Sequence, residues 1–129
     1  MDLDTLLNKN QKEAATYLDS HLRIIAGAGS GKTRVVTYRI AHLIQDIGID
    51  PRSILAITFT NKAANEMKER VNEIVGIHGS GTLICTIHSL CVRLLRQHIN
   101  VLNYPSNFTI MDEEDQKALI KKLYTQLEI

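Results

Sequence analysis

The chain has 129 residues and a formal net charge of +1 at pH 7, and 44% of its residues are apolar. This length suffices for one domain with one hydrophobic core, and the small net charge excludes a globally basic, nucleic-acid-binding surface. The two cysteines are too few for a disulfide framework, and no stretch is apolar enough to act as a signal peptide or to cross a bilayer. We therefore expect a cytoplasmic protein without membrane contact, in which Cys85 and Cys91 are reduced core residues.

The first predicted helix begins after Asn8. Asn8 can cap a helix, and Gln11 lies three residues later, as in a capping box. We expect this short helix to continue through Ala14 to Leu18. An apolar strand is then predicted over residues 22–26.

Residues 26–33 have the composition of a phosphate-binding loop, Ala-Gly-Ala-Gly-Ser-Gly-Lys-Thr. The glycines let the backbone turn several N–H groups inward, and the helix that starts near Gly31 adds its unpaired N–H groups. Lys32 suits the β- and γ-phosphates, and the hydroxyl of Thr33 suits Mg²⁺. The strict pattern begins with glycine, where this chain has Ala26. We predict a site for a nucleoside triphosphate and Mg²⁺ made of Ala26, Gly27, Ala28, Gly29, Ser30, Gly31, Lys32 and Thr33. The alternative is a glycine-rich turn before a helix that happens to carry Lys-Thr.

Two further strand–helix pairs follow the loop. The helix after the loop has an apolar face and ends before Gly48 and Asp50-Pro51, which break the chain. A strand is predicted over 54–58, then a helix closed by Gly76, a loop over 78–81, a strand over 82–86 and another helix. The expected apolar faces of the three helices are Val36, Ile40, Leu43 and Ile44; Ala63, Ala64, Met67, Val71, Ile74 and Val75; and Ile87, Leu90, Cys91, Leu94, Leu95 and Ile99.

This alternation of apolar strands and helices predicts an α/β fold with a parallel sheet covered on both faces by helices. Ligands of such sheets collect at the carboxyl ends of the strands. We therefore expect residues 26–33, 58–62 and 86–89 to converge there. A metal site of Cys85, His88 and Cys91 is not expected, because structural zinc needs a fourth ligand and none stands nearby.

The pattern changes after residue 100. Residues 100–107 are predicted to be a connector, and Asp112 then caps a helix that carries Leu119, Ile120, Leu123 and Leu127. We expect one domain over 1–100 and the start of a second over 101–129.

Four stretches together resemble the N-terminal part of a UvrD/Rep-type DNA helicase of superfamily one, in the order and spacing of that family. The resemblance covers nearly the whole chain. It implies a P-loop NTPase of RecA-like fold, and it makes 101–129 the start of an inserted helical subdomain. The stretches are Leu7-Asn8-x-x-Gln11-x-x-Ala14, residues 26–34, Ile57-Thr58-Phe59-Thr60-Asn61-Lys62-Ala63-Ala64-x-Glu66-Met67, and Thr86-Ile87-His88-Ser89-Leu90-Cys91-x-Arg93-Leu94-Leu95-Arg96.

The resemblance also implies roles at the nucleotide. The nucleotide would be ATP with Mg²⁺, and Lys32 and Thr33 would take part in catalysis. The amide of Gln11 would read the adenine edge, since it offers a donor and an acceptor together; alternatively it only completes the capping box, and the two roles are compatible. Arg34 would lie near the nucleotide, or it is an ordinary solvated helix residue.

A second set of residues would contact single-stranded DNA. A base can stack on Phe59, and Thr60 and Asn61 can bond phosphate or sugar oxygens. The alternative is a core phenylalanine followed by a capping threonine. Thr86 and His88 would contact the DNA backbone, although His88 can equally be a helix-start residue bonded to a neighbouring loop.

The parent protein would be an ATP-dependent DNA helicase of the DNA-repair type, translocating on single-stranded DNA with 3′-to-5′ polarity by analogy with the family. Its second Walker element, a strand ending in Asp-Glu, is expected beyond residue 129. Asp112-Glu113 resembles it, but the acidic residues that follow are typical of a helix start. We therefore expect no steady ATP turnover from these residues alone. The alternatives are a P-loop kinase or transferase, which has no use for Phe59, and a non-catalytic nucleotide-binding module.

Overall fold

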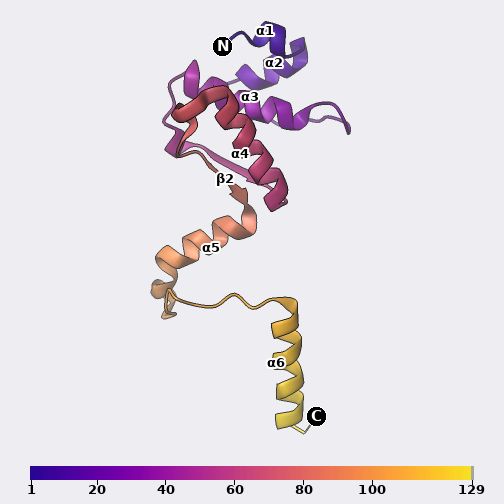
Figure 1. Cartoon of the computed structure of the whole chain (residues 1–129), viewed down its shortest axis with the longest axis vertical. Helices are drawn as coiled ribbons and strands as arrows, with labels where there is room; N and C mark the ends of the chain where they lie inside the picture. The colour runs from indigo at the N-terminus through magenta and orange to yellow at the C-terminus, as the bar shows by residue number, and fades with distance from the viewer. Residues whose placement is uncertain (129) are drawn as a thin grey trace. The chain divides into compact units, whose positions relative to one another are not determined.

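The computed structural model of the chain describes residues 1–128 (Figure 1). It forms two compact units, one of residues Met1–Leu90 and a second that begins at Cys91. The domain boundary that we predicted near residue 100 stays a prediction.

The first unit begins with helices α1 (Leu3–Leu6), α2 (Lys9–Thr16) and α3 (Lys32–Gln45). The predicted capping box at the start of α2 is confirmed, because the Asn8 side chain accepts from the Gln11 N–H and the Gln11 side chain accepts from the Asn8 N–H. The helix ends two residues before Leu18, which is exposed. Its apolar residues pack with α1 and α3 in a small core of Leu3, Leu7, Ala15 and Val35.

Arg39 forms hydrogen bonds with the last backbone carbonyl groups of α2. Nη1 of Arg39, in α3, donates to the carbonyl oxygens of Ala14 (3.1 Å), Ala15 (3.5 Å) and Tyr17 (2.6 Å). The last carbonyls of a helix have no partner within the helix. Arg39 therefore joins α3 to α2 by satisfying them with a charged donor.

The sheet consists of two parallel strands, β1 (Leu55–Thr58) and β2 (Leu83–Thr86), as predicted. A short 3-10 helix, η1 (Pro51–Ser53), precedes β1. The crossover is α4 (Asn61–Val75), which ends at Gly76 and continues into a second 3-10 helix, η2 (Gly76–Gly79), where we expected a loop. The register pairs Leu55 with Leu83 and Thr58 with Thr86, so both strands end at the same edge.

The main core lies where α3 and α4 meet β2 (Figure 1). We expected helices on both faces of the sheet, and this is wrong for the part of the chain that the structure describes. Leu55 and Ile57 point away from the core and are 50% and 46% exposed, because no described helix covers their face. The buried members are Ile40, Ala41, Ile44, Ala64, Met67, Val71, Val75 and Ile84.

The strand predicted over residues 22–26 is absent from the described chain. This segment has no regular secondary structure, and Ile25 in it is 86% exposed. A strand exists only when a neighbour pairs its N–H and C=O groups. Here β1 and β2 pair only with each other, in a two-stranded sheet. The RecA-like arrangement of the strands therefore stays a prediction.

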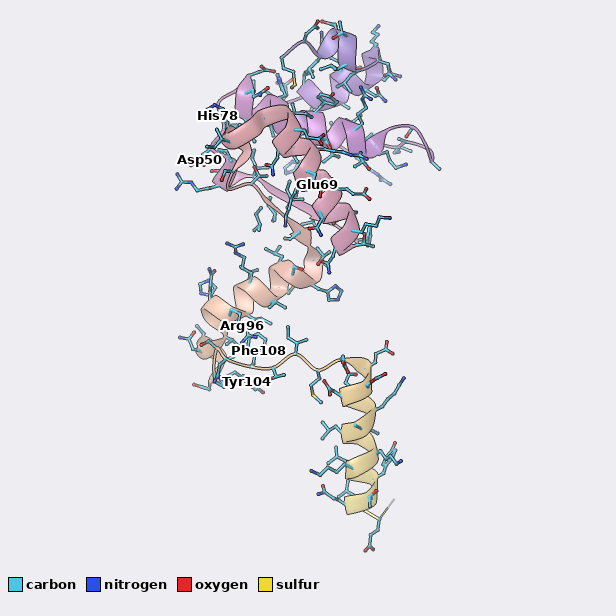
Figure 2. The ribbon with its side chains drawn as sticks, viewed as in Figure 1. Asp50, Glu69, His78, Arg96, Tyr104 and Phe108 are labelled. Atoms are coloured by element: carbon cyan, nitrogen blue, oxygen red, sulfur yellow. The ribbon has the colours of Figure 1, made fainter. Side chains whose placement is uncertain are left out.

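The remaining elements are α5 (Ile87–His98), η3 (Ile99–Leu102) and α6 (Glu113–Gln126). Neither α5 nor α6 contains a buried residue, so the expectation that Cys91 is a core residue is wrong: its side chain is exposed, and Cys85 is only half-buried. In the second unit the guanidinium of Arg96 lies over the Phe108 ring, 4.1 Å from its centroid, and donates to the Ser106 carbonyl at 2.6 Å (Figure 2). No helix within residues 1–128 combines the length and the apolar character that crossing a membrane requires.

Candidate functional site

The loop of residues 26–33 leads directly into α3. Gly29 and Gly31 have φ angles of 73° and 82°, a left-handed conformation that disfavours any residue with a Cβ. Ser30 closes a tight turn, since its N–H and its hydroxyl both donate to the Gly27 carbonyl, at 3.4 and 2.7 Å. Gly27 itself has an ordinary φ, and a side chain there would meet open space.

The start of α3 differs from the starts of α2, α4 and α6. α2, α4 and α6 are each capped by a side chain, whereas Gly31, at the N-cap position of α3, has no side chain that could cap the helix. The first N–H groups of a helix have no partner within the helix. In α3 these groups and the positive end of the helix dipole therefore face the loop, which is the arrangement that attracts an anion.

Lys32 and Thr33 form the first turn of α3, and both are exposed. The Lys32 ammonium folds back onto the loop and donates to the carbonyl oxygens of Ala26 (3.1 Å) and Gly27 (2.7 Å). This donor set of N–H groups, an ammonium and a hydroxyl fits a polyphosphate. Lys32 would neutralise its charge, and the Thr33 hydroxyl would be a ligand for the accompanying Mg²⁺.

A cavity of about 290 Å³ lies beside the loop. Its apolar wall suits a planar base, and its amides suit the hydrogen-bonding edge of that base. We did not predict from the sequence that Asn10 lines this cavity. Its position in the first turn of α2, next to Gln11, could have indicated this. The lining residues are Asn8, Asn10, Gln11, Ala14, Ile24, Ile25, Ala26, Ser30, Lys32 and Val35.

Gln11 and Arg34 are both occupied by contacts within the protein. Besides its part in the capping box, Gln11 donates from Nε2 to the Ser30 carbonyl at 3.1 Å. Arg34 donates from Nη2 to the Leu6 carbonyl at 2.8 Å, and its guanidinium lies over the Tyr38 ring, 5.5 Å from the centroid. Arg34 is thus not a freely solvated residue, and it is not among the residues that line the loop cavity. Its role at a nucleotide stays a prediction.

Two of the three junctions predicted to converge do so, because β1 and β2 are parallel and Thr58 pairs with Thr86. Phe59 follows β1 and is 100% exposed, so the alternative of a core phenylalanine is wrong. The alternative assignment of Thr60 is confirmed: its hydroxyl accepts from the Ala63 N–H at 3.1 Å and caps α4. Asn61 is the first residue of α4 and is exposed. The third junction, residues 26–33, is not joined to this edge by a strand.

Of the two side chains predicted to contact DNA at the end of β2, only one is exposed. Thr86 is only 6% exposed, and its hydroxyl lies 2.9 Å from the Ser89 hydroxyl and accepts from the Ser89 N–H at 3.2 Å. His88, in the first turn of α5, is exposed and can be reached from solvent. Contacts of both residues with DNA stay predictions, and His88 is the better placed of the two.

Asp112 and Glu113 have the geometry of a helix start. The Asp112 carboxylate accepts from the Asp115 N–H at 2.8 Å and caps α6, and the described residues directly before it form no strand. Asp112 is therefore used by its own helix. Among residues 1–128, no three His, Cys, Asp or Glu side chains are grouped to hold a metal ion.

Two carboxylates away from the loop have perturbed pKa values. Hydrogen bonds from His42 and from the Met1 ammonium lower the pKa of Asp46. Hydrogen bonds from Arg52 lower the pKa of Asp50. Asp50 and His78, which are both labelled in Figure 2, belong to the lining of a cavity of about 410 Å³.

Comparison with known proteins gives the chain a family. Residues 7–129 match the family described as UvrD/REP helicase N-terminal domain. The chain is 50% identical over 115 residues to the ATP-dependent DNA helicase PcrA of Staphylococcus aureus, and to the same degree to PcrA of Staphylococcus epidermidis. These alignments cover 89% of the chain but only 16% of each relative, so the chain spans a small part of the length of the curated relatives that it matches. The chain belongs to the UvrD/REP helicase family, and it matches that family's N-terminal domain.

Proposed function

We propose that this chain is the ATP-binding part of an ATP-dependent DNA helicase and that it contributes part of the track for single-stranded DNA. The uncapped start of α3, with Lys32 and Thr33 in its first turn, carries the proposal. The N–H groups at the amino end of this 14-residue helix have no partner within the helix, and they favour a phosphate group. Two glycines in the left-handed conformation curl the backbone of the loop beside them. Membership of the UvrD/REP helicase family, and the ATP-dependent helicase activity after which the PcrA relatives are named, support ATP as the nucleotide.

The DNA track would lie at the carboxyl edge of β1 and β2. Phe59 offers an exposed aromatic face, on which a base can stack without sequence preference. Thr60, Asn61 and His88 would contact the backbone of the strand. The parent would move along DNA through cycles of ATP binding and hydrolysis, with 3′-to-5′ polarity by analogy with the family.

These residues alone would bind ATP without steady turnover. Asp112 and Glu113, the acidic pair that resembles the second Walker element, lie at the start of α6, where Asp112 caps the helix. Phosphoryl transfer requires groups that hold the metal and orient the attacking water. Robust hydrolysis by the 129-residue chain, stimulated by DNA, would contradict this and favour a catalytic role for Asp112 and Glu113.

Calorimetry of the full-length protein with magnesium-ATP tests the nucleotide site. Lys32→Ala removes a charged partner of the phosphates and should weaken binding by roughly 10- to 150-fold, because such hydrogen bonds contribute about 1.5–3 kcal/mol. Lys62→Ala is the matched control, since Lys62 also lies in the first turn of a helix and is exposed. Equal affinities in the wild type and both variants would exclude the proposed site.

A further inference from the structure

The Gln11 side chain connects two separate parts of the first unit. Its Oε1 accepts from the Asn8 N–H at 3.1 Å, within the capping box of α2. Its Nε2 donates to the Ser30 carbonyl at 3.1 Å, across 19 positions of the chain. One carboxamide therefore ties the start of a helix to the centre of the phosphate-binding loop.

This hydrogen bond joins residues 26–30 to a part of the chain outside the loop. The other hydrogen bonds of residues 26–30 in the described chain stay within the loop or come from Lys32: Ser30 donates to Gly27, and Lys32 donates to Ala26 and Gly27. Residues 27–30 are exposed, so packing does little to hold their shape. Without Gln11, residues 26–30 would keep only the hydrogen bonds among themselves and those from Lys32.

The packing at Gly31 supports the same conclusion. A Cβ added at Gly31 would lie 2.8 Å from Nε2 of Gln11, so the end of the Gln11 side chain would have to move away. A Cβ added at Gly27 or Gly29 would meet nothing within 4 Å. The loop is thus open at two glycines and is in contact with the Gln11 carboxamide at the third.

The carboxamide still has unused hydrogen-bonding capacity. It carries two N–H donors and an oxygen with two lone pairs, and the two contacts use one donor and one lone pair. Gln11 can therefore hold the loop and read a base with what remains.

We propose that Gln11 is a positioning residue for the phosphate-binding loop: through Ser30 it holds the loop in the shape that receives a polyphosphate, whatever base is attached. The proposal rests on the proposed function, since it concerns the same nucleotide site. If Gln11 only read the base, it would not affect the binding of a ligand that has no base. The affinity for the phosphates themselves depends on Gln11.

Inorganic tripolyphosphate, which has no base, separates the two roles. Calorimetry of the full-length protein with magnesium-ATP and with magnesium-tripolyphosphate compares wild type, Gln11→Ala and Glu13→Ala. Gln11→Ala should weaken both ligands by about 3- to 10-fold, the range expected for one lost hydrogen bond. Glu13→Ala truncates an exposed side chain of the same helix that does not line the loop cavity, and it should change the affinity for tripolyphosphate less than about twofold.

A double-mutant cycle tests the contact itself. Gly31→Ala places a residue with a Cβ at a positive φ in any background, but only when Gln11 is present does it also displace Nε2 from its bond with Ser30. Its further loss of tripolyphosphate affinity should therefore be smaller in Gln11→Ala than in the wild type. Gly29→Ala is the control, because the same strain without a neighbour should cost equally in both backgrounds.

The outcomes separate the two levels of the argument. A wild type that binds neither ligand would overturn the proposed function, and this inference with it. A wild type that binds both, with Gln11→Ala weakening ATP alone, would overturn only the positioning role. Equal costs of Gly31→Ala in the two backgrounds would also overturn it.

Discussion

Phe59→Ala removes the aromatic face that we assign to the DNA track. Phe59 is 100% exposed, so its truncation removes no buried surface and should leave folding unchanged. Stacking of a base on an aromatic side chain contributes about 1–3 kcal/mol. The variant should therefore bind single-stranded DNA roughly 5- to 150-fold more weakly.

Fluorescence anisotropy of a labelled oligothymidine with the full-length protein measures this change across a salt series. The logarithmic salt slope should stay unchanged, because phenylalanine carries no charge and releases no counterions from DNA. Ile77→Ala is the matched control: Ile77 is 85% exposed, but it lies in η2, where the chain leads towards the amino end of β2. An affinity within twofold of the wild type, or an equal loss in Ile77→Ala, would refute the reasoning.

Three further predictions concern stability, measured by urea denaturation of the chain. Arg39→Ala leaves the carbonyls at the end of α2 without their charged donor and should lower the free energy of unfolding by about 1.5–3 kcal/mol; a loss below 0.5 kcal/mol would show that water replaces the guanidinium. Ile84→Ala should cost about 2–5 kcal/mol, because the side chain is 2% exposed, whereas Ile25→Ala, at an 86% exposed position, should cost almost nothing. The lowered pKa of Asp46 means that its ionised form stabilises the fold above pH 3.8 and that this contribution is lost as the pH falls through the lowered value. Asp46→Asn should therefore be less stable than the wild type at pH 7 and should approach it in acid, and a difference independent of pH would contradict the ion pairs.

The parts of the site formed within a few residues could be predicted from the sequence. The capping box of Asn8 and Gln11 and the cap at Thr60 are confirmed, because each depends on groups three residues apart. The contacts of the same region that cross longer distances could not be predicted. Gln11 reaches Ser30 and Arg34 reaches Leu6, since long polar side chains take the partners that packing brings to them.

The same distinction holds for the fold. Short-range periodicity was enough to identify helices α2 to α6 and two of the strands, because side-chain spacing determines which face of an element is apolar, but it did not predict α1. Residues 22–26 are as apolar as Leu55–Thr58, yet they form no strand, since a strand also needs a neighbour with free N–H and C=O groups. Exposure was likewise a matter of tertiary packing. Phenylalanine and cysteine are often buried in proteins, but the side chains of Phe59 and Cys91 are exposed because no described element covers them.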